Sequence, residues 1–212
     1  MSKFDRIIAA ILIIALIGGT WSVLGITGFA SERNTRQTIQ KLAVKDERTL
    51  IEKKGIEVLK AIKSGDPKKL AAFVDPKKNL VLSMYPSIMK GDYVSLSKSK
   101  LTALGKKTKL QWGYADGTGA PVKLTFGDFK KKYLWNHDYL SKEIEVNYGS
   151  STSRGNIPAN YMEKFKEGIA IEYFYPGTEE YAQMDWSSII LIFEKTGDRY
   201  YLSCIALDYW TV

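Results

Sequence analysis

The sequence predicts an α+β domain that follows an N-terminal transmembrane helix. Three observations lead to this fold class. Residues 7–30 carry no charged side chain, residues 31–64 contain no proline and only one glycine, and beyond Pro76 apolar residues recur with a period of two. The period of two is typical of strands, and a stretch without helix breakers is typical of a helix. Helices that precede a run of antiparallel strands give an α+β architecture.

The uncharged segment has the length of a membrane span. A helix rises 1.5 Å per residue, so the 24 residues at 7–30 cross a hydrocarbon layer of roughly 30 Å. This predicts contact with the lipid bilayer through residues 7–30 and a short cytoplasmic head at residues 1–6. The small residues Gly28 and Ala30 leave a second interpretation open, in which a signal peptide is cleaved after Ala30 and the protein is secreted.

The charges on the two sides of the span bear on its orientation in the membrane. Lys3 and Arg6 precede the span, whereas five basic residues follow it between positions 33 and 48, which by the positive-inside rule favours an inward domain. The rule weakens when a long domain follows the span. We therefore expect a single-pass membrane protein with an extracytoplasmic C-terminal domain, against the charge count.

A helical stalk is predicted at residues 31–50 and the domain at residues 51–212. Ile51, Val58, Leu59 and Ile62 recur on one helical face, so the far part of this helix should pack on the domain. The sequence of residues 64–67, Ser-Gly-Asp-Pro, suits the end of one helix and the start of another. The oligomeric state is not determined by this pattern.

The sequence predicts mainly strands in the rest of the domain. Asp116 and the glycines 117 and 119 should form the turn of a hairpin. Short helices are expected at 128–135 and 158–167. The predicted strands are 80–85, 109–115, 121–126, 144–148, 169–175, 187–195 and 199–210. Residues 189–193 are apolar on both faces, which predicts a central strand with a helix on one side.

Two segments resemble a known superfamily. The helix, Gly-Asp turn and second helix at 58–74, together with the closing hairpin at 189–211, are similar to the ketosteroid-isomerase and nuclear-transport-factor-two superfamily. Residues 124–126, 135–140 and 184–186 look like parts of uncharacterised extracytoplasmic proteins of Gram-positive bacteria. The resemblance implies an NTF2-like cone, that is, a curved antiparallel sheet packed on helices with a pocket at its open end. It assigns no functional residue, because members of the superfamily differ in activity.

The side-chain inventory excludes several chemistries. One cysteine, Cys204, cannot form an internal disulfide or a multi-cysteine zinc site, and one histidine, His137, cannot form a multi-histidine metal site. His137 is a lone base or, more simply, a loop residue. We expect no metal and no cofactor, and we assign no catalytic residue.

Aromatic and acidic residues supply the binding candidates. An aspartate beside tryptophan can have a raised pKa, and an exposed aromatic ring can bind a sugar or a protein partner. Both residue types can equally serve the core, since alternating aromatics in strands are usually buried. The candidates are Trp112, Tyr114, Asp185, Trp186, Asp208 and Trp210.

The net charge of +8 predicts an anionic partner. We expect an envelope protein or an anionic wall polymer, and no nucleic acid, because no nucleic-acid motif is present. Lys-Lys pairs begin at positions 53, 68, 77, 106 and 130 and are scattered, which is typical of a solvated surface. The expected function is a non-enzymatic binding or assembly module at the cell envelope. The alternative is a small-molecule carrier or an isomerase-like or dehydratase-like enzyme that uses the cone pocket.

Overall fold

The computed structural model describes residues 27–149 and 153–211. The predicted cytoplasmic head at residues 1–6 and nearly all of the predicted span at residues 7–30 lie outside this part of the chain. Within the described ranges, no helix combines the length and the apolar character needed to cross a membrane.

The long helix α2 covers Thr27–Ser64, which confirms the predicted helix and extends it towards the N-terminus. The chain divides into two compact units, residues 1–46 and residues 47–212, so the second unit begins within α2. In the second unit Ile51, Val58, Leu59 and Ile62 are fully buried. The apolar face expected from their spacing is therefore the face that packs on the domain.

A tight turn leads from α2 into the short helix α3, Pro67–Ala71. Gly65 adopts the left-handed conformation (φ 69°). The Asp66 carboxylate caps α3 by accepting the backbone N–H of Lys68 at 2.9 Å, as the pattern at residues 64–67 predicts.

Six strands form the main sheet, in the order β2-β1-β8-β7-β6-β5. Their bounds are Asn79–Ser83 (β1), Tyr93–Ser97 (β2), Glu145–Tyr148 (β5), Gly168–Tyr175 (β6), Ser187–Thr196 (β7) and Arg199–Tyr209 (β8). The pair β1 and β8 is parallel, with Val81 opposite Cys204. The expectation of an antiparallel sheet was therefore wrong in this respect, and the sheet is mixed. The sequence shows the alternation within a strand but not which strand lies beside it, and the first and last strands meet here.

The strand β7 lies between β8 and β6, which confirms the predicted central strand. Ile189, Leu191 and Phe193 on one face belong to the main core, together with the buried side chains of α2. Ile190 and Ile192 on the other face belong to a second cluster with Tyr161 of the short helix α6, Tyr161–Lys164. Both faces of the sheet are thus covered, because the 153–165 region packs on the side that α2 leaves open.

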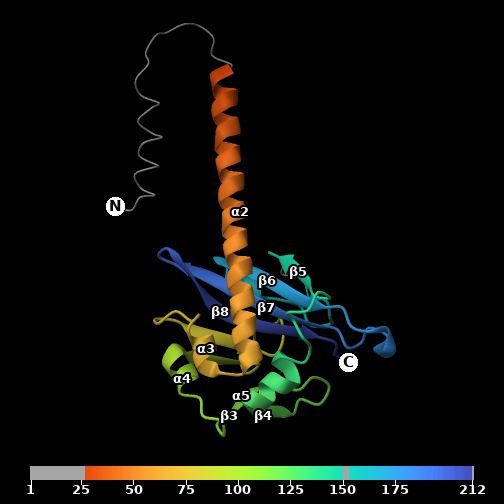
Figure 1. The fold of residues 1–212 in the computed structure, drawn as a ribbon. Coiled ribbons are helices and arrows are strands. Elements are labelled where there is room, and N and C mark those ends of the chain that lie inside the picture. The colour runs from red at the N-terminus through yellow and green to blue at the C-terminus, as the bar shows by residue number, and fades with distance from the viewer. Residues whose placement is uncertain (1–26, 150–152, 212) are drawn as a thin grey trace. The chain divides into compact units, whose positions relative to one another are not determined.

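The predicted hairpin is also present, as β3 (Lys109–Tyr114) paired with β4 (Pro121–Thr125) in a separate two-stranded sheet. Figure 1 shows this hairpin at one end of the domain with α3, α4 (Lys98–Thr102) and α5 (Phe126–Phe129). The π-helical turn η1 (Lys130–Leu134) continues α5, and η2 (Glu179–Tyr181) is a 3-10 turn before β7. The strand β2, the helix α4 and the turn η2 have no counterpart among the predicted elements.

Candidate functional site

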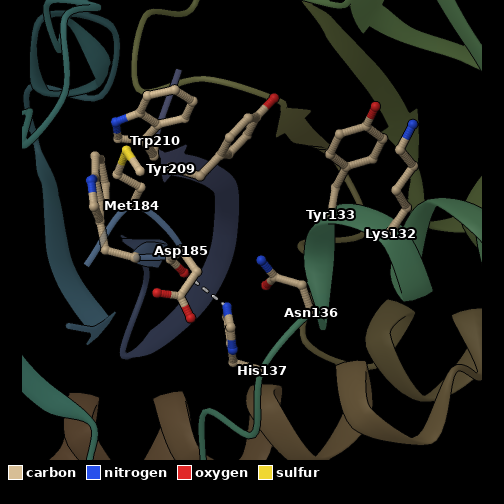
Figure 2. Close-up of a pocket in the computed structure, with 9 residues that line it drawn as sticks. Lys132, Tyr133, Asn136, His137, Met184, Asp185, Tyr209 and Trp210 are labelled. Atoms are coloured by element: carbon tan, nitrogen blue, oxygen red, sulfur yellow. Dashed lines mark hydrogen bonds between the residues drawn. The ribbon is translucent and has the colours of Figure 1, made fainter. Parts of the chain in front are cut away.

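A cleft whose lining includes several aromatic rings lies where β8 ends. It consists of two adjoining hollows of about 230 Å³ each, which share Tyr133, Tyr209 and Trp210. We call it the aromatic cleft, and Figure 2 shows the first hollow. The other residues of that hollow are Lys132, Asn136, His137, Met184, Asp185 and Trp186, and the second hollow adds Ala115, Asp116 and Thr211.

Four segments build the cleft, and one of them is the hairpin turn that contains Ala115 and Asp116. Tyr133 comes from η1, Met184 and Trp186 come from the loop before β7, and Tyr209 is the last residue of β8. The backbone N–H of Trp210 donates to the carbonyl oxygen of Trp186 at 3.4 Å, which ties the end of the chain to the loop. Trp210 is 43% exposed and Met184 is 51% exposed, so the rim of the cleft is open to a partner.

The aromatic rings continue from the cleft into the core. The Tyr209 ring centroid lies 6.0 Å from that of Tyr133 and 5.7 Å from that of Tyr85. Phe129 follows, at 5.8 Å from Tyr133, and stacks on Trp112 at 4.0 Å. These rings restrain one another, so the wall of the cleft is supported from behind. Burial and the neighbouring Tyr85 hydroxyl raise the pKa of the Tyr209 phenol, which stays neutral.

The carboxylate of Asp185 holds the loop that carries Met184. Its Oδ1 accepts the backbone N–H of Thr178 at 2.7 Å, and its Oδ2 accepts the Thr178 hydroxyl at 3.2 Å. The loop also contains Ala182 and Gln183 in the left-handed region, at φ 50° and φ 58°. Non-glycine residues adopt this conformation only when surrounding contacts enforce it. The Asp185 carboxylate therefore has a structural role in this loop.

His137 is held between the loop and β6. Its Nε2 lies 3.0 Å from the backbone oxygen of Asp185, and its ring stacks on Tyr175 with centroids 3.8 Å apart. Burial is the main cause that lowers the pKa of the His137 imidazole, and the contacts with Asp185 oppose it. At neutral pH the ring is uncharged, and its Nε2 is engaged by the protein itself.

Asp208 lies on the other face of the sheet from the cleft, in a buried polar network. Its Oδ2 accepts the backbone N–H of Arg154 at 2.8 Å and the Ser153 hydroxyl at 3.2 Å. Arg154 also pairs with Glu172 at 3.1 Å, and the Ser188 hydroxyl donates to Glu172 at 2.6 Å. Burial raises the pKa of the Asp208 carboxyl to about 6, although the hydrogen bonds from Arg154 and Ser153 oppose this. The network fastens the 153–155 segment to the sheet.

Three of the six predicted candidates line the aromatic cleft, and the other three, Trp112, Tyr114 and Asp208, do not. Asp185, Trp186 and Trp210 come together in the aromatic cleft. Trp112 is fully buried and its indole N–H donates to the Leu124 carbonyl at 3.0 Å. Tyr114 is 42% exposed on the hairpin, and it does not line the cleft.

In the first hollow, six lining residues were not among the predicted binding candidates: Lys132, Tyr133, Asn136, His137, Met184 and Tyr209. One signal could have found part of this set, since Tyr209 lies directly between the predicted candidates Asp208 and Trp210. The residues of the 132–137 segment were missed because they are distant in sequence from the loop before β7 and from the end of β8.

Metal-ligating residues do not gather in the described part of the chain. No group of three or more His, Cys, Asp or Glu side chains that could hold a metal ion occurs within residues 27–149 and 153–211.

No model of a known protein family matches the chain, and no curated protein matches it. Several solved structures are similar to it. An NTF2-like designed protein, Rd1NTF2_05, has a TM-score of 0.37 at 11% identity and covers 76% of this chain and 98% of its own. A DUF4783 family protein from Bacteroides ovatus has a TM-score of 0.33 at 16% identity and covers 74% and 94%.

The third similar structure is a putative calcium/calmodulin dependent protein kinase II association domain from Xanthomonas campestris. Its TM-score is 0.31 at 10% identity, with 77% of this chain and 85% of that chain covered. All three TM-scores lie below 0.5 and all three identities below 25%, so these likenesses assign neither a superfamily nor an activity to this chain.

Proposed function

We propose that this protein is a binding module of the cell envelope, which holds a partner in the aromatic cleft without chemical turnover. The observation that carries the proposal is the state of the acid-base groups at the cleft. The Asp185 carboxylate binds Thr178 of its own loop, and His137 binds the backbone of Asp185. The lining also contains the polar side chains of Lys132, Asn136 and Asp116. We expect a partner to contact mainly the rings of Tyr133, Tyr209 and Trp210, because such rings bind protein segments or sugar rings.

The membrane attachment is part of the same proposal. It is supported by the uncharged residues 7–30 and by the resemblance of residues 124–126, 135–140 and 184–186 to extracytoplasmic proteins of Gram-positive bacteria. A single span there would hold the domain outside the cell, next to other envelope proteins and to the wall. Digestion of intact cells with protease tests on which side of the membrane the domain lies. We expect loss of residues 47–212, and protection of the domain would contradict the proposal.

Cross-linking in intact cells tests the role of the cleft. A photoreactive residue is placed at Met184, which is 51% exposed on the rim. We expect one discrete adduct with an envelope component, and the substitution Trp210→Ala should reduce its yield because it removes the exposed ring. The same photoreactive residue at Lys166, an exposed position in a segment that does not line the cleft, is the matched control.

The carrier or enzyme alternative predicts a different result. If a small molecule were turned over and Asp208→Asn abolished the turnover, the binding-module proposal would be wrong. Equal adduct yields from positions 184 and 166 would also contradict a role for the cleft. A discrete adduct from position 184 that depends on Trp210 supports it.

A further inference from the structure

Positive charge is concentrated in one stretch of the domain. Residues 98–132 contain nine lysines and two aspartates, which gives this segment a formal charge of +7. Residues 133–212 contain six Lys or Arg residues and twelve Asp or Glu residues, which gives −6. Such an uneven distribution is an electrostatic signature of an interaction surface for an anionic partner.

The fold brings together lysine pairs that are scattered in the sequence. A depression of about 270 Å³ is lined by Gly65 and Pro67, by Leu104 to Lys106, and by Phe126 and Gly127. Each of these three segments adjoins a run of lysines, at 68–69, 106–107 and 130–132. The side chain of Lys130 lies against Gly65, and its Nζ donates to the carbonyl oxygen of Lys63 at 2.7 Å.

The hairpin extends this surface. Gln111 of β3 pairs with Lys123 of β4, and Leu110 pairs with Leu124. The two leucines face the core, so Lys123 and the alternate residue Lys109 face outwards and are exposed. We call the resulting surface the basic face and define it by six exposed lysines, Lys68, Lys69, Lys106, Lys107, Lys109 and Lys123. Figure 1 shows their elements α3, β3 and β4 at the same end of the domain.

The acidic residues near the basic face have structural partners. Asp66 caps α3 through the N–H of Lys68, and Asp128 accepts the hydroxyl of Thr125 at 2.7 Å. Among the side chains that the structure describes, none of the six lysines forms an ion pair with a carboxylate. Their charge is thus available to a partner.

We propose that the basic face binds a linear polymer of phosphate groups. Its charges come from lysine alone, since residues 49–153 contain no arginine. Lysine presents a compact point charge, whereas arginine recognises phosphate with a fixed bidentate geometry. Point charges spread over a hollowed surface suit a flexible polyanion whose phosphates have no fixed orientation. Binding such a chain releases its condensed counterions, which favours association.

Two other anionic partners fit the basic face less well. Among the described residues, Tyr114 is the one large exposed apolar side chain on the hairpin that carries Lys109 and Lys123, and a single ring offers little area for insertion or stacking. A surface that inserts into a bilayer needs such side chains, and a surface that binds single-stranded nucleic acid uses aromatic rings for stacking. The basic face is also distinct from the aromatic cleft, because the depression shares no lining residue with either hollow.

Fluorescence anisotropy with labelled long-chain inorganic polyphosphate tests the proposal on the full-length chain in non-ionic detergent. The variant carries K106Q, K107Q, K109Q and K123Q. We expect saturable binding by the native chain, with affinity falling as salt rises from about 50 to about 200 mM. The variant should bind about tenfold or more weakly, and its salt dependence should be shallower by up to about 3 in slope, as expected for four lost phosphate contacts.

The matched control removes the same charge elsewhere. K142Q, K164Q, K166Q and R199Q lower the net charge equally, and these four side chains are exposed outside the basic face. The control should keep the native affinity within about twofold, because the contacts are local. Equal losses in both variants, or no binding of polyphosphate at 50 mM salt, would overturn the proposal.

Vesicles of phosphatidylglycerol and a single-stranded DNA serve as competing ligands. If either bound the native chain more tightly than polyphosphate of equal charge, and the basic-face variant lost that binding, the partner class would be wrong. Circular dichroism of both variants before each titration establishes that a lost affinity does not come from unfolding. If the fourfold variant is unfolded by circular dichroism, the double variants K106Q/K107Q and K109Q/K123Q replace it. Each should then change the slope of the salt dependence by half as much.

Discussion

Asp208 shows how burial turns a single carboxyl group into a pH-dependent contribution to stability. Burial raises its pKa from 3.8 to about 6 in the folded protein. Between these two values the folded state binds more protons than the unfolded state, so the free energy of unfolding falls as pH rises. The size of the effect is on the order of 3 kcal/mol, from about 1.4 kcal/mol per pKa unit.

The substitution Asp208→Asn should remove this dependence. An amide keeps an acceptor oxygen for the Arg154 N–H but cannot ionise. Urea midpoints measured at several pH values between about 4 and 7 should fall in the native chain and change less in the variant. Asp198→Asn, in the exposed turn after β7, is the control. If the urea midpoint of the Asp208→Asn chain depended on pH as strongly as that of the native chain, the Asp208 carboxyl would not be the source of the pH dependence.

Asp185 matters to the cleft through the loop it holds. Asp185→Ala removes the acceptor of both Thr178 bonds, and we expect a loss of about 1 to 3 kcal/mol in the free energy of unfolding. Asp185→Asn, which keeps an oxygen for the Thr178 N–H, should lose less. Urea denaturation and the adduct yield from position 184 measure the two consequences. Glu179→Ala, an exposed substitution in η2, should change neither. If Asp185→Ala also leaves both unchanged, the loop is held by other contacts.

At the scale of elements, the packing of α2 on β6 depends on one glycine. A Cβ added at Gly55 would meet the hydroxyl of Tyr173, which is buried and has no hydrogen-bond partner in the described structure. Alanine favours a helix over glycine by about 1 kcal/mol. At Gly55 the close contact outweighs this helix preference, because overpacking a core costs roughly 1 to 3 kcal/mol.

We therefore predict that Gly55→Ala destabilises the protein and that a second substitution, Tyr173→Phe, restores part of the loss. Tyr173→Phe alone should be neutral or stabilising, since it removes an unsatisfied buried hydroxyl. Urea denaturation of the double-mutant cycle measures the coupling. Gly127→Ala, at an exposed site where the nearest atom to an added Cβ is 3.9 Å away, should be tolerated. Additive effects in the cycle would contradict the proposed contact.

At the scale of the whole molecule, the described core lies within residues 47–212. Every buried apolar residue of both clusters comes from this unit, as does the hydrogen bond from the Tyr200 hydroxyl to Glu47. A chain that begins at Glu47 should therefore fold by itself. We expect a single cooperative urea transition for residues 47–212 in the absence of detergent. A gradual transition, or aggregation at all concentrations, would show that residues before 47 are needed.

The distribution of charge also belongs to this scale. The −6 of residues 133–212 and the +7 of residues 98–132 follow from the sequence alone. Their meaning for binding does not, since the lysine runs at 68, 106 and 130 become neighbours only around the depression beside α3 and α5. A scattered pattern in the sequence is thus compatible with one continuous surface.

The sequence by itself determined the local structure of this protein. The apolar spacing on α2, the Gly65-Asp66-Pro67 turn, the hairpin around Asp116 and the central position of β7 were all predicted correctly. Each of these depends on periodicity or on turn chemistry within a few residues. Of the candidate site, Asp185, Trp186 and Trp210 were named from their local context and do line the cleft.

Only the tertiary structure decided which distant segments meet. It paired β1 in parallel with β8 and brought η1 to the loop before β7. The physical reason is that strand order and cleft composition depend on contacts between segments far apart in the chain, whereas the patterns read from the sequence report only on near neighbours.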